Sequence, residues 1–153
     1  MRHNKTQNTR TGIGQSGAPI MLTHSIQSDF LPMVLVVDDM PTNLDVAISH
    51  LASEALDVRA ALSGQEALEL ASELEPDLIL LDIMMPEMTG YEVCRWLKKD
   101  PALAHIPVVF LSAMGEDIHK ERGHVVGGVD HITKPFSASA LSRTVWTHLK
   151  HVH

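Results

Sequence analysis

The sequence predicts a doubly wound α/β domain built on a five-stranded parallel sheet. Short runs of successive apolar residues recur along the chain, as is typical of strands that are buried on both faces; they are VLVVD, LILLD and VVFLS. Longer amphipathic segments with helical periodicity lie between these runs. Strands that alternate with helices through short loops indicate βα units with right-handed crossovers.

Five βα units follow from residue 33 onward. Strands are expected at 33–38, 57–61, 77–82, 106–111 and 129–132. Helices are expected at 42–55, 64–74, 90–99, 115–126 and 137–150.

Residues that start and stop helices agree with these boundaries. Pro41 favours a helix start directly after the first strand. Ser63 and Glu66 have the spacing of a capping box at the start of the second helix. Pro76 ends that helix, because the residue before a proline avoids helical geometry. The segment MMPEMTG is expected to be a loop, and Pro101 follows the end of the third helix.

Composition bounds the class of protein. The chain has 153 residues, enough for one domain with a real core, and 44% of them are apolar. Cys94 is the only cysteine, so no intramolecular disulfide is possible. The sequence has no apolar run of the length of a membrane span and no signal-peptide pattern. We therefore expect a cytoplasmic protein with no membrane partner.

Charge and complexity divide the chain into an extension and a domain. Residues 1–32 are rich in Thr, Gln, Asn, Gly and Ser, which predicts a disordered extension. Their formal charge of +2 leaves −9 for the rest of a chain whose net charge is −7. Direct nucleic-acid binding is not expected of such an acidic domain. The domain is expected at 33–150, with a short C-terminal tail at 151–153.

Chemically capable side chains follow four of the predicted strands. They are Asp38, Asp39, Asp82, Ser112 and Lys134. Ligand sites in parallel sheets lie outside the carboxyl ends of the strands. If the strand order is 2-1-3-4-5, the first, third, fourth and fifth strands are contiguous and these side chains meet at one edge.

The three carboxylates require a cation or raised pKa values, because like charges at one edge repel. A set of oxygen ligands without His or Cys favours Mg²⁺ over zinc. A metal held by carboxylates, with an ammonium and a hydroxyl opposite, can receive and neutralise a phosphoryl group.

The chain resembles the receiver domain of two-component response regulators over about residues 33–150. The motifs that carry the resemblance are VDDMPTN, LILLDIMMPEMTGYEVCRWLK, IPVVFLSAM and GGVDHITKPF. The resemblance implies a CheY-like, flavodoxin-like fold with strand order 2-1-3-4-5. It is closest to receivers attached to larger signalling proteins, such as cyclic-dinucleotide enzymes and hybrid kinases. A stand-alone receiver and a piece of a longer protein both remain open.

The resemblance also implies roles for the acids. Asp82 would be the nucleophile that takes a phosphoryl group from a phosphohistidine. Asp39 would bind Mg²⁺ directly and Asp38 mainly through water, while Asp82 and the backbone carbonyl of Met84 would complete the protein ligands.

Four further positions match the family's phosphate-binding and switch residues. Lys134 would pair with the phosphoryl oxygens, and Ser112 would donate its hydroxyl to one of them. The Lys134–Pro135 peptide bond is commonly cis in the family. His131 stands where the family usually places Tyr or Phe, so the usual aromatic switch is replaced by a smaller side chain that can titrate.

The expected partners follow from these roles. They are a sensor histidine kinase or histidine phosphotransfer protein, an effector protein or attached output domain, and a second copy of the chain. Binding would change at the face formed by the fourth helix, fifth strand and fifth helix. The chain would catalyse only its own phosphorylation and dephosphorylation.

Three alternative functions compete with the phospho-accepting receiver. The first is a phosphorylation-independent receiver that serves as a protein-binding module. The second is a phosphatase with an aspartate nucleophile, which needs a second acid where Met40 stands. The third is a flavodoxin-like cofactor carrier, whose phosphate loop would be incompatible with DDMPTN.

Overall fold

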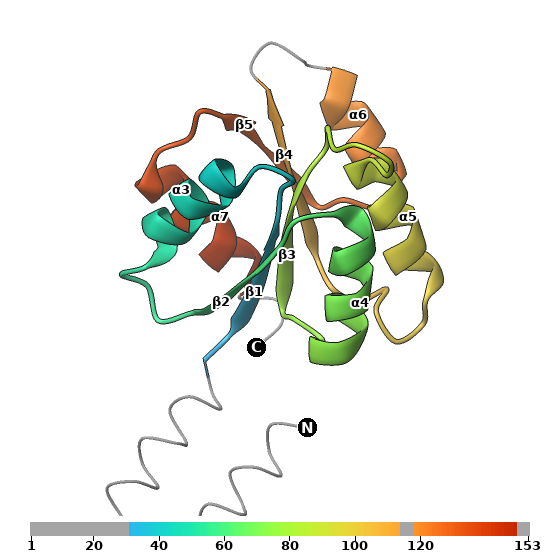
Figure 1. Cartoon of the computed structure of the whole chain (residues 1–153), viewed down its shortest axis with the longest axis horizontal. Helices are drawn as coiled ribbons and strands as arrows, with labels where there is room; N and C mark the ends of the chain where they lie inside the picture. Colours follow the sequence, from blue (N-terminus) through green and yellow to red (C-terminus); the bar gives the residue numbers. More distant parts are fainter. Residues whose placement is uncertain (1–30, 114–117, 150–153) are drawn as a thin grey trace, which may run out of the picture. The chain divides into compact units, whose positions relative to one another are not determined.

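Five parallel strands form one sheet in the order β2-β1-β3-β4-β5 (Figure 1). This computed structural model describes residues 31–113 and 118–149. The strands are β1 (Met33–Val37), β2 (Asp57–Ala61), β3 (Leu78–Asp82), β4 (Val108–Ala113) and β5 (Asp130–Lys134). The predicted fold class and strand order are confirmed.

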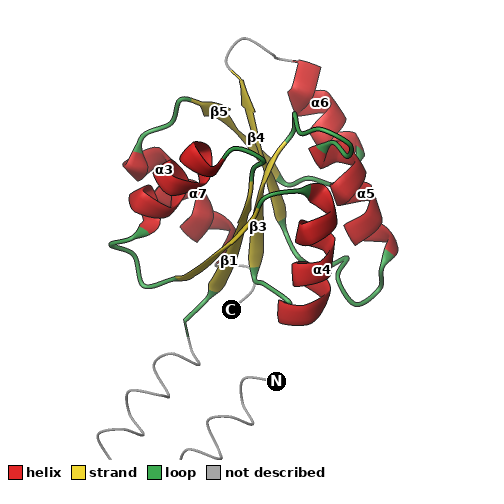
Figure 2. Cartoon of the chain, viewed as in Figure 1, coloured by secondary structure: helices red, strands yellow, loops and turns green. Residues whose placement is uncertain are grey.

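Helices cover both faces of the sheet (Figure 2). They are α3 (Pro41–Leu51), α4 (Gly64–Leu74), α5 (Gly90–Lys99), α6 (Ile118–Val125) and α7 (Ala138–Leu149). Helices α3 and α7 lie on one face, and α4, α5 and α6 lie on the other (Figure 1). Each strand is followed by a helix, as the alternating sequence pattern predicts.

Apolar side chains fill the space on each side of the sheet. Every residue of β1 and β3 is buried, because these strands have helices on both faces. One core cluster joins strand residues to α3 and α7, and the other joins them to α4 and α5. The two layers hold the carboxyl ends of β1 and β3 rigidly side by side.

Local capping explains where two of the helices begin. Ser63 Oγ accepts a hydrogen bond from the Glu66 amide, and the Glu66 carboxylate accepts one from the Leu62 amide. Thr89 and Glu92 form a reciprocal capping box at the start of α5. Both helices therefore begin where the sequence predicts.

Strands β4 and β5 are shifted from their predicted ranges. Pro107 has no amide hydrogen for the ladder, so β4 begins after it and continues through Ala113. Strand β5 extends to Lys134, which pairs with Ala113 in the last rung. Ser112 and Lys134 therefore belong to the sheet rather than to the loops that follow it.

Helix α3 ends at Leu51, four residues before its predicted end. The chain turns there, because the Glu54 amide donates to the Leu51 carbonyl. The Glu54 carboxylate also accepts a hydrogen bond of 2.8 Å from Trp146 Nε1 on α7. This contact between distant segments favours the turn over another helical turn.

Several predictions concern residues outside the described part of the chain. The disordered extension and the C-terminal tail fall almost wholly there, as does the predicted start of the fourth helix. None of the helices in the described ranges has the length and apolar character that a membrane span requires.

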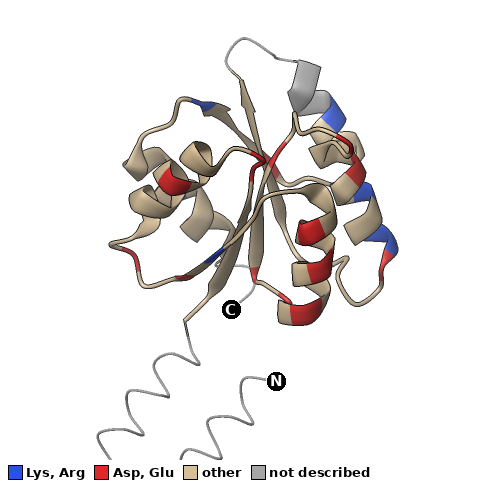
Figure 3. Cartoon of the chain, in the orientation of Figure 1, with Lys and Arg blue, Asp and Glu red and all other residues tan. Residues whose placement is uncertain are grey.

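Charge is distributed unevenly over neighbouring helices. Acidic residues recur along α4, whereas Lys and Arg occur along α5 (Figure 3). On α5, Lys99 Nζ lies 5.4 Å from the ring centroid of the exposed Trp96. The two adjacent helices thus offer surfaces of opposite charge on the same face of the sheet (Figure 3).

Candidate functional site

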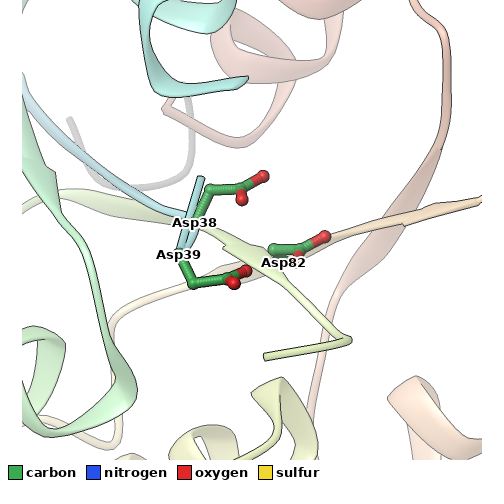
Figure 4. Close-up of side chains that lie close together, drawn as sticks. All are labelled: Asp38, Asp39 and Asp82. Atoms are coloured by element: carbon green, nitrogen blue, oxygen red, sulfur yellow. The ribbon is translucent and has the colours of Figure 1, made fainter. Parts of the chain in front are cut away.

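Three carboxylates meet at the carboxyl ends of β1 and β3. The ladder pairs Val37 with Leu81, so the next residue on each strand, Asp38 and Asp82, lies at the same level. One carboxylate oxygen from each of Asp38, Asp39 and Asp82 lies within 4.8 Å of the others. Figure 4 shows the three side chains pointing to the same side of the strand ends.

Lys134 brings a positive charge to this cluster from β5. Its Nζ donates to Asp38 Oδ2 at 2.8 Å and to Asp82 Oδ1 at 2.9 Å. The backbone of Lys134 is fixed by its rung with Ala113. The ammonium therefore bridges two carboxylates from strands that are distant in sequence.

The first helix holds Asp38 in place. Asp38 Oδ1 accepts hydrogen bonds from the Met40 amide at 3.0 Å and from Asn43 Nδ2 at 3.4 Å. The side chain of Asp38 is almost fully buried, whereas Asp39 is half-buried. Asp38 thus serves both the helix start and the acidic cluster.

Burial and charge shift two pKa values in the cluster. Burial raises the pKa of Asp82; hydrogen bonding to Lys134 opposes this effect, and the charges of Asp38 and Asp39 add to it. Burial acts to lower the pKa of Lys134, but hydrogen bonds and charge from Asp38 and Asp82 raise it overall. Both pKa values can be raised at once, because Asp82 is buried beside two other acids and one cation, while Lys134 is hydrogen-bonded to two acids.

The raised pKa of Asp82 predicts a pH-dependent stability difference for Asp82→Asn. The folded protein binds this proton more tightly than the unfolded chain does, so the ionised group costs more stability as pH rises above about 4. In Mg²⁺-free buffer at pH 7, we expect the variant to unfold a few degrees above wild type, with the difference shrinking toward pH 4. Thermal unfolding followed by circular dichroism tests this, and a pH-independent difference would contradict it.

Ser112 and His131 form a second polar contact at the same edge. Ser112 Oγ and His131 Nε2 are hydrogen-bonded between β4 and β5. Ser112 is buried and His131 is half-buried. The predicted switch positions are therefore joined to each other in this structure.

Gly90 fixes the loop that follows Asp82. A Cβ atom at Gly90 would lie 2.4 Å from the Asp82 carbonyl oxygen and 3.0 Å from Ile83 Cα. The Gly90 amide also donates to the Ile83 carbonyl at 2.9 Å. This close approach draws the start of α5 against the end of β3.

Gly90→Ala is expected to lower the free energy of unfolding by roughly 1 to 3 kcal/mol, because backbone atoms cannot move aside as side chains can. Gly64→Ala is the matched control: the three atoms nearest to its Cβ would be side-chain atoms of Val93 and Met88. Urea unfolding of both variants measures the difference. An equal loss of unfolding free energy in the two variants would show that the backbone at Asp82 can move away from residue 90.

A pocket of about 430 Å³ opens beside Asp38 and Lys134. Side chains of α3, the end of β4 and the segment after β5 line it; among them are Val46, Ala113 and Phe136. Its walls are mainly apolar, and its charged corner belongs to the acidic site.

The donor set fits Mg²⁺. The clustered ligand atoms are carboxylate oxygens, which are the ligands that this hard cation prefers. Met84 lies two residues after Asp82 in the loop that follows β3, and its side chain is exposed. The Lys134–Pro135 peptide bond is cis, as predicted.

Comparison with known proteins identifies the family. A family model described as the response regulator receiver domain matches residues 34–145. The chain is a receiver domain.

Similar proteins place this receiver among response regulators. It is 42% identical over 117 residues to a probable cyclic di-GMP phosphodiesterase of Vibrio cholerae, covering 76% of this chain and 26% of that protein. It is 43% identical over 102 residues to the response regulator PleD of Caulobacter vibrioides, covering 67% of this chain and 22% of that protein. The chain thus spans about a quarter of the length of these two relatives.

A solved structure shows the same fold. The crystal structure of a putative response regulator from Chloroflexus aurantiacus is 30% identical, with a TM-score of 0.76. The match covers 78% of this chain and 98% of that one. The receiver fold therefore accounts for nearly all of that crystallised chain.

The fold brings the three acids and Lys134 together and joins Ser112 to His131 on the neighbouring strands, but sequence reasoning missed two supporting residues. Asn43 binds Asp38 from the first turn of α3, and its place just after Pro41 was the available signal. Gly90 leaves no space for a side chain beside the carbonyl of Asp82, and its place after Thr89 at a helix start was the signal there. Asn43 thus helps to position Asp38, and Gly90 allows the close packing beside Asp82.

Proposed function

We propose that Asp82 accepts a phosphoryl group from the phosphohistidine of a sensor histidine kinase or histidine phosphotransfer protein. A carboxylate oxygen attacks phosphorus, the phosphorus–nitrogen bond breaks, and the histidine nitrogen keeps the electron pair. The product is an acyl phosphate on Asp82. The supporting observation is the Asp82 carboxylate at the end of a central strand, beside two more acids and hydrogen-bonded to Lys134.

Mg²⁺ is the cofactor that this site would hold. Asp39 would bind it directly and Asp38 mainly through water, with Asp82 and the Met84 carbonyl as further ligands. The bound ion would neutralise charge on the phosphoryl group during transfer. Half-buried Asp39 is suited to direct binding, since Asp38 already accepts bonds at both oxygens.

Lys134 and Ser112 would respond to the new phosphoryl group. Phosphorylation adds negative charge and strong acceptor oxygens at Asp82. The Lys134 ammonium, already hydrogen-bonded to Asp82, would pair with a phosphoryl oxygen. The Ser112 hydroxyl would donate to another. Water attack on phosphorus would later restore the carboxylate and release phosphate.

The output would be a change in binding at the face formed by α6, β5 and α7. An equilibrium between inactive and active forms would shift when the phosphoryl group favours one of them. The partner would be an effector protein, an attached output domain or a second copy of this chain. The chain would catalyse no reaction other than its own phosphorylation and dephosphorylation, and its kinase partner implies a cytoplasmic location.

Intact mass after incubation with acetyl phosphate tests the chemistry. We expect one added phosphoryl group with Mg²⁺ and none with excess EDTA. Absence of the adduct with acetyl phosphate and with a promiscuous histidine kinase would overturn the proposal, and would favour a phosphorylation-independent binding module. Solution scattering with and without beryllofluoride tests the output, and identical profiles together with unchanged partner binding would contradict it.

A further inference from the structure

His131 reaches Ser112 across the β4–β5 ladder. The register pairs Phe110 with His131 and Ser112 with Thr133. Because side chains alternate between faces, Ser112 and His131 project on the same face, two positions apart. The result is a hydrogen bond between His131 Nε2 and Ser112 Oγ at the carboxyl edge of the sheet.

The backbone of His131 is itself held in place. Its amide donates to Asp130 Oδ1 at 2.7 Å. Asp130 Oδ2 is 2.8 Å from Nε2 of His148 on α7. The ring of His131 therefore extends from a strand residue that is tied to the last helix.

The hydroxyl of Ser112 has a single hydrogen, which limits what the pair can do. If Ser112 donates to His131 Nε2, that hydrogen is not available to a phosphoryl oxygen. If Nε2 carries a hydrogen and donates to Oγ, the Ser112 hydrogen is available for the phosphoryl group. Phenylalanine could make neither hydrogen bond, so the choice depends on the imidazole.

The geometry points to His131 as a positioning residue for Ser112. Phosphorylation of Asp82 selects the form of the ring that carries a hydrogen on Nε2, and this form orients the Ser112 hydroxyl toward the phosphoryl group. The inference rests on the proposed phospho-accepting function and adds a residue and a hydrogen-bond direction to it. His131 does not take part in the reaction itself and acts only through Ser112.

The affinity for beryllofluoride in the presence of Mg²⁺ measures how much the His131–Ser112 hydrogen bond contributes to binding of the phosphoryl analogue. His131→Phe removes the hydrogen bond and is expected to weaken binding about five-fold, the effect of one typical hydrogen bond. His131→Gln places an amide near the position of Nε2 and is expected to recover most of the affinity. His105→Phe is the matched control: His105 is exposed and lies in the loop before β4, at the opposite end of that strand.

A double-mutant cycle ties the effect to Ser112. If His131 acts through the hydroxyl, Ser112→Ala with His131→Phe is expected to bind as weakly as Ser112→Ala alone. Independent, additive losses would overturn the positioning role. Circular dichroism of each variant checks that the fold is retained, and His131→Gln keeps the test valid if His131→Phe fails to fold.

Nitrogen chemical shifts of the His131 imidazole report which ring nitrogen carries the hydrogen. A purely structural role of His131 would not require that hydrogen to be on Nε2. The His131 resonances are assigned from their loss in His131→Gln. With Mg²⁺ and saturating beryllofluoride, we expect Nε2 to carry a hydrogen. A hydrogen-free Nε2 in the loaded protein would overturn the inference.

The outcomes separate the two proposals. If wild type binds no beryllofluoride with Mg²⁺ and gains no phosphoryl group, the proposed function and this inference both fail. If wild type binds the analogue but His131→Phe binds equally well, only the role of His131 fails. Weakened binding in His131→Phe, recovery in His131→Gln and a hydrogen on Nε2 together support it.

Discussion

Asp82→Asn should abolish phosphoryl transfer to the domain. The variant keeps the size of the side chain, but its amide is a far poorer nucleophile than a carboxylate and forms no stable acyl phosphate. With acetyl phosphate and Mg²⁺, we expect one added phosphoryl group in wild type and none in the variant, measured by intact mass.

Asp45→Asn is the matched control for this experiment. Asp45 is exposed on α3 and does not line the pocket beside the site. We expect it to accept the phosphoryl group like wild type. An adduct on Asp82→Asn would mean that another residue is the acceptor, and peptide mapping would then locate it.

Lys134→Met should strengthen Mg²⁺ binding while weakening the metal-free fold. The ammonium lies 2.8 Å from Asp38 and 2.9 Å from Asp82, so it competes with a cation for the same oxygens. Removing it is expected to lower the Kd for Mg²⁺ about ten-fold. Titration calorimetry measures this change.

The same substitution leaves two buried carboxylates without their cation. In Mg²⁺-free buffer at pH 7, we expect a loss of roughly 1 to 3 kcal/mol in the free energy of unfolding. Because the folded pKa of Lys134 is raised, its contribution is present at neutral pH and would be lost only as pH rises above about 10.5. Added Mg²⁺ should restore much of the stability.

Lys99→Met controls for loss of a lysine as such, since Lys99 is exposed and lies over Trp96. It is expected to change neither Mg²⁺ affinity nor stability appreciably. Unchanged or weaker Mg²⁺ binding in Lys134→Met would show that the ammonium does not compete for the carboxylates.

Sequence patterns located the acids well, because strand ends can be read from apolar runs. Asp38 and Asp82 each close such a run, and the strand order brings them together. Lys134 and Ser112 were placed just past their strands. The ladder includes them instead, since the β4–β5 register depends on pairing between segments that local patterns do not specify.

Contacts between distant segments explain the remaining differences. The early end of α3 accompanies a hydrogen bond from Trp146, which is 92 residues from Glu54. The bond between His131 and Ser112 depends on both the register and the side-chain conformations. Neither kind of information is present in the periodicity of a single segment.

The last rung of the β4–β5 ladder joins Ala113 to Lys134. Terminal rungs open and close more often than central ones, and amide hydrogen exchange reports that opening. Fraying of this rung would release the Lys134 backbone and loosen Ser112 in one event. The lifetime of this one backbone pairing would limit how long the Lys134 ammonium stays hydrogen-bonded to Asp82, and hydrogen exchange at these amides would measure that lifetime.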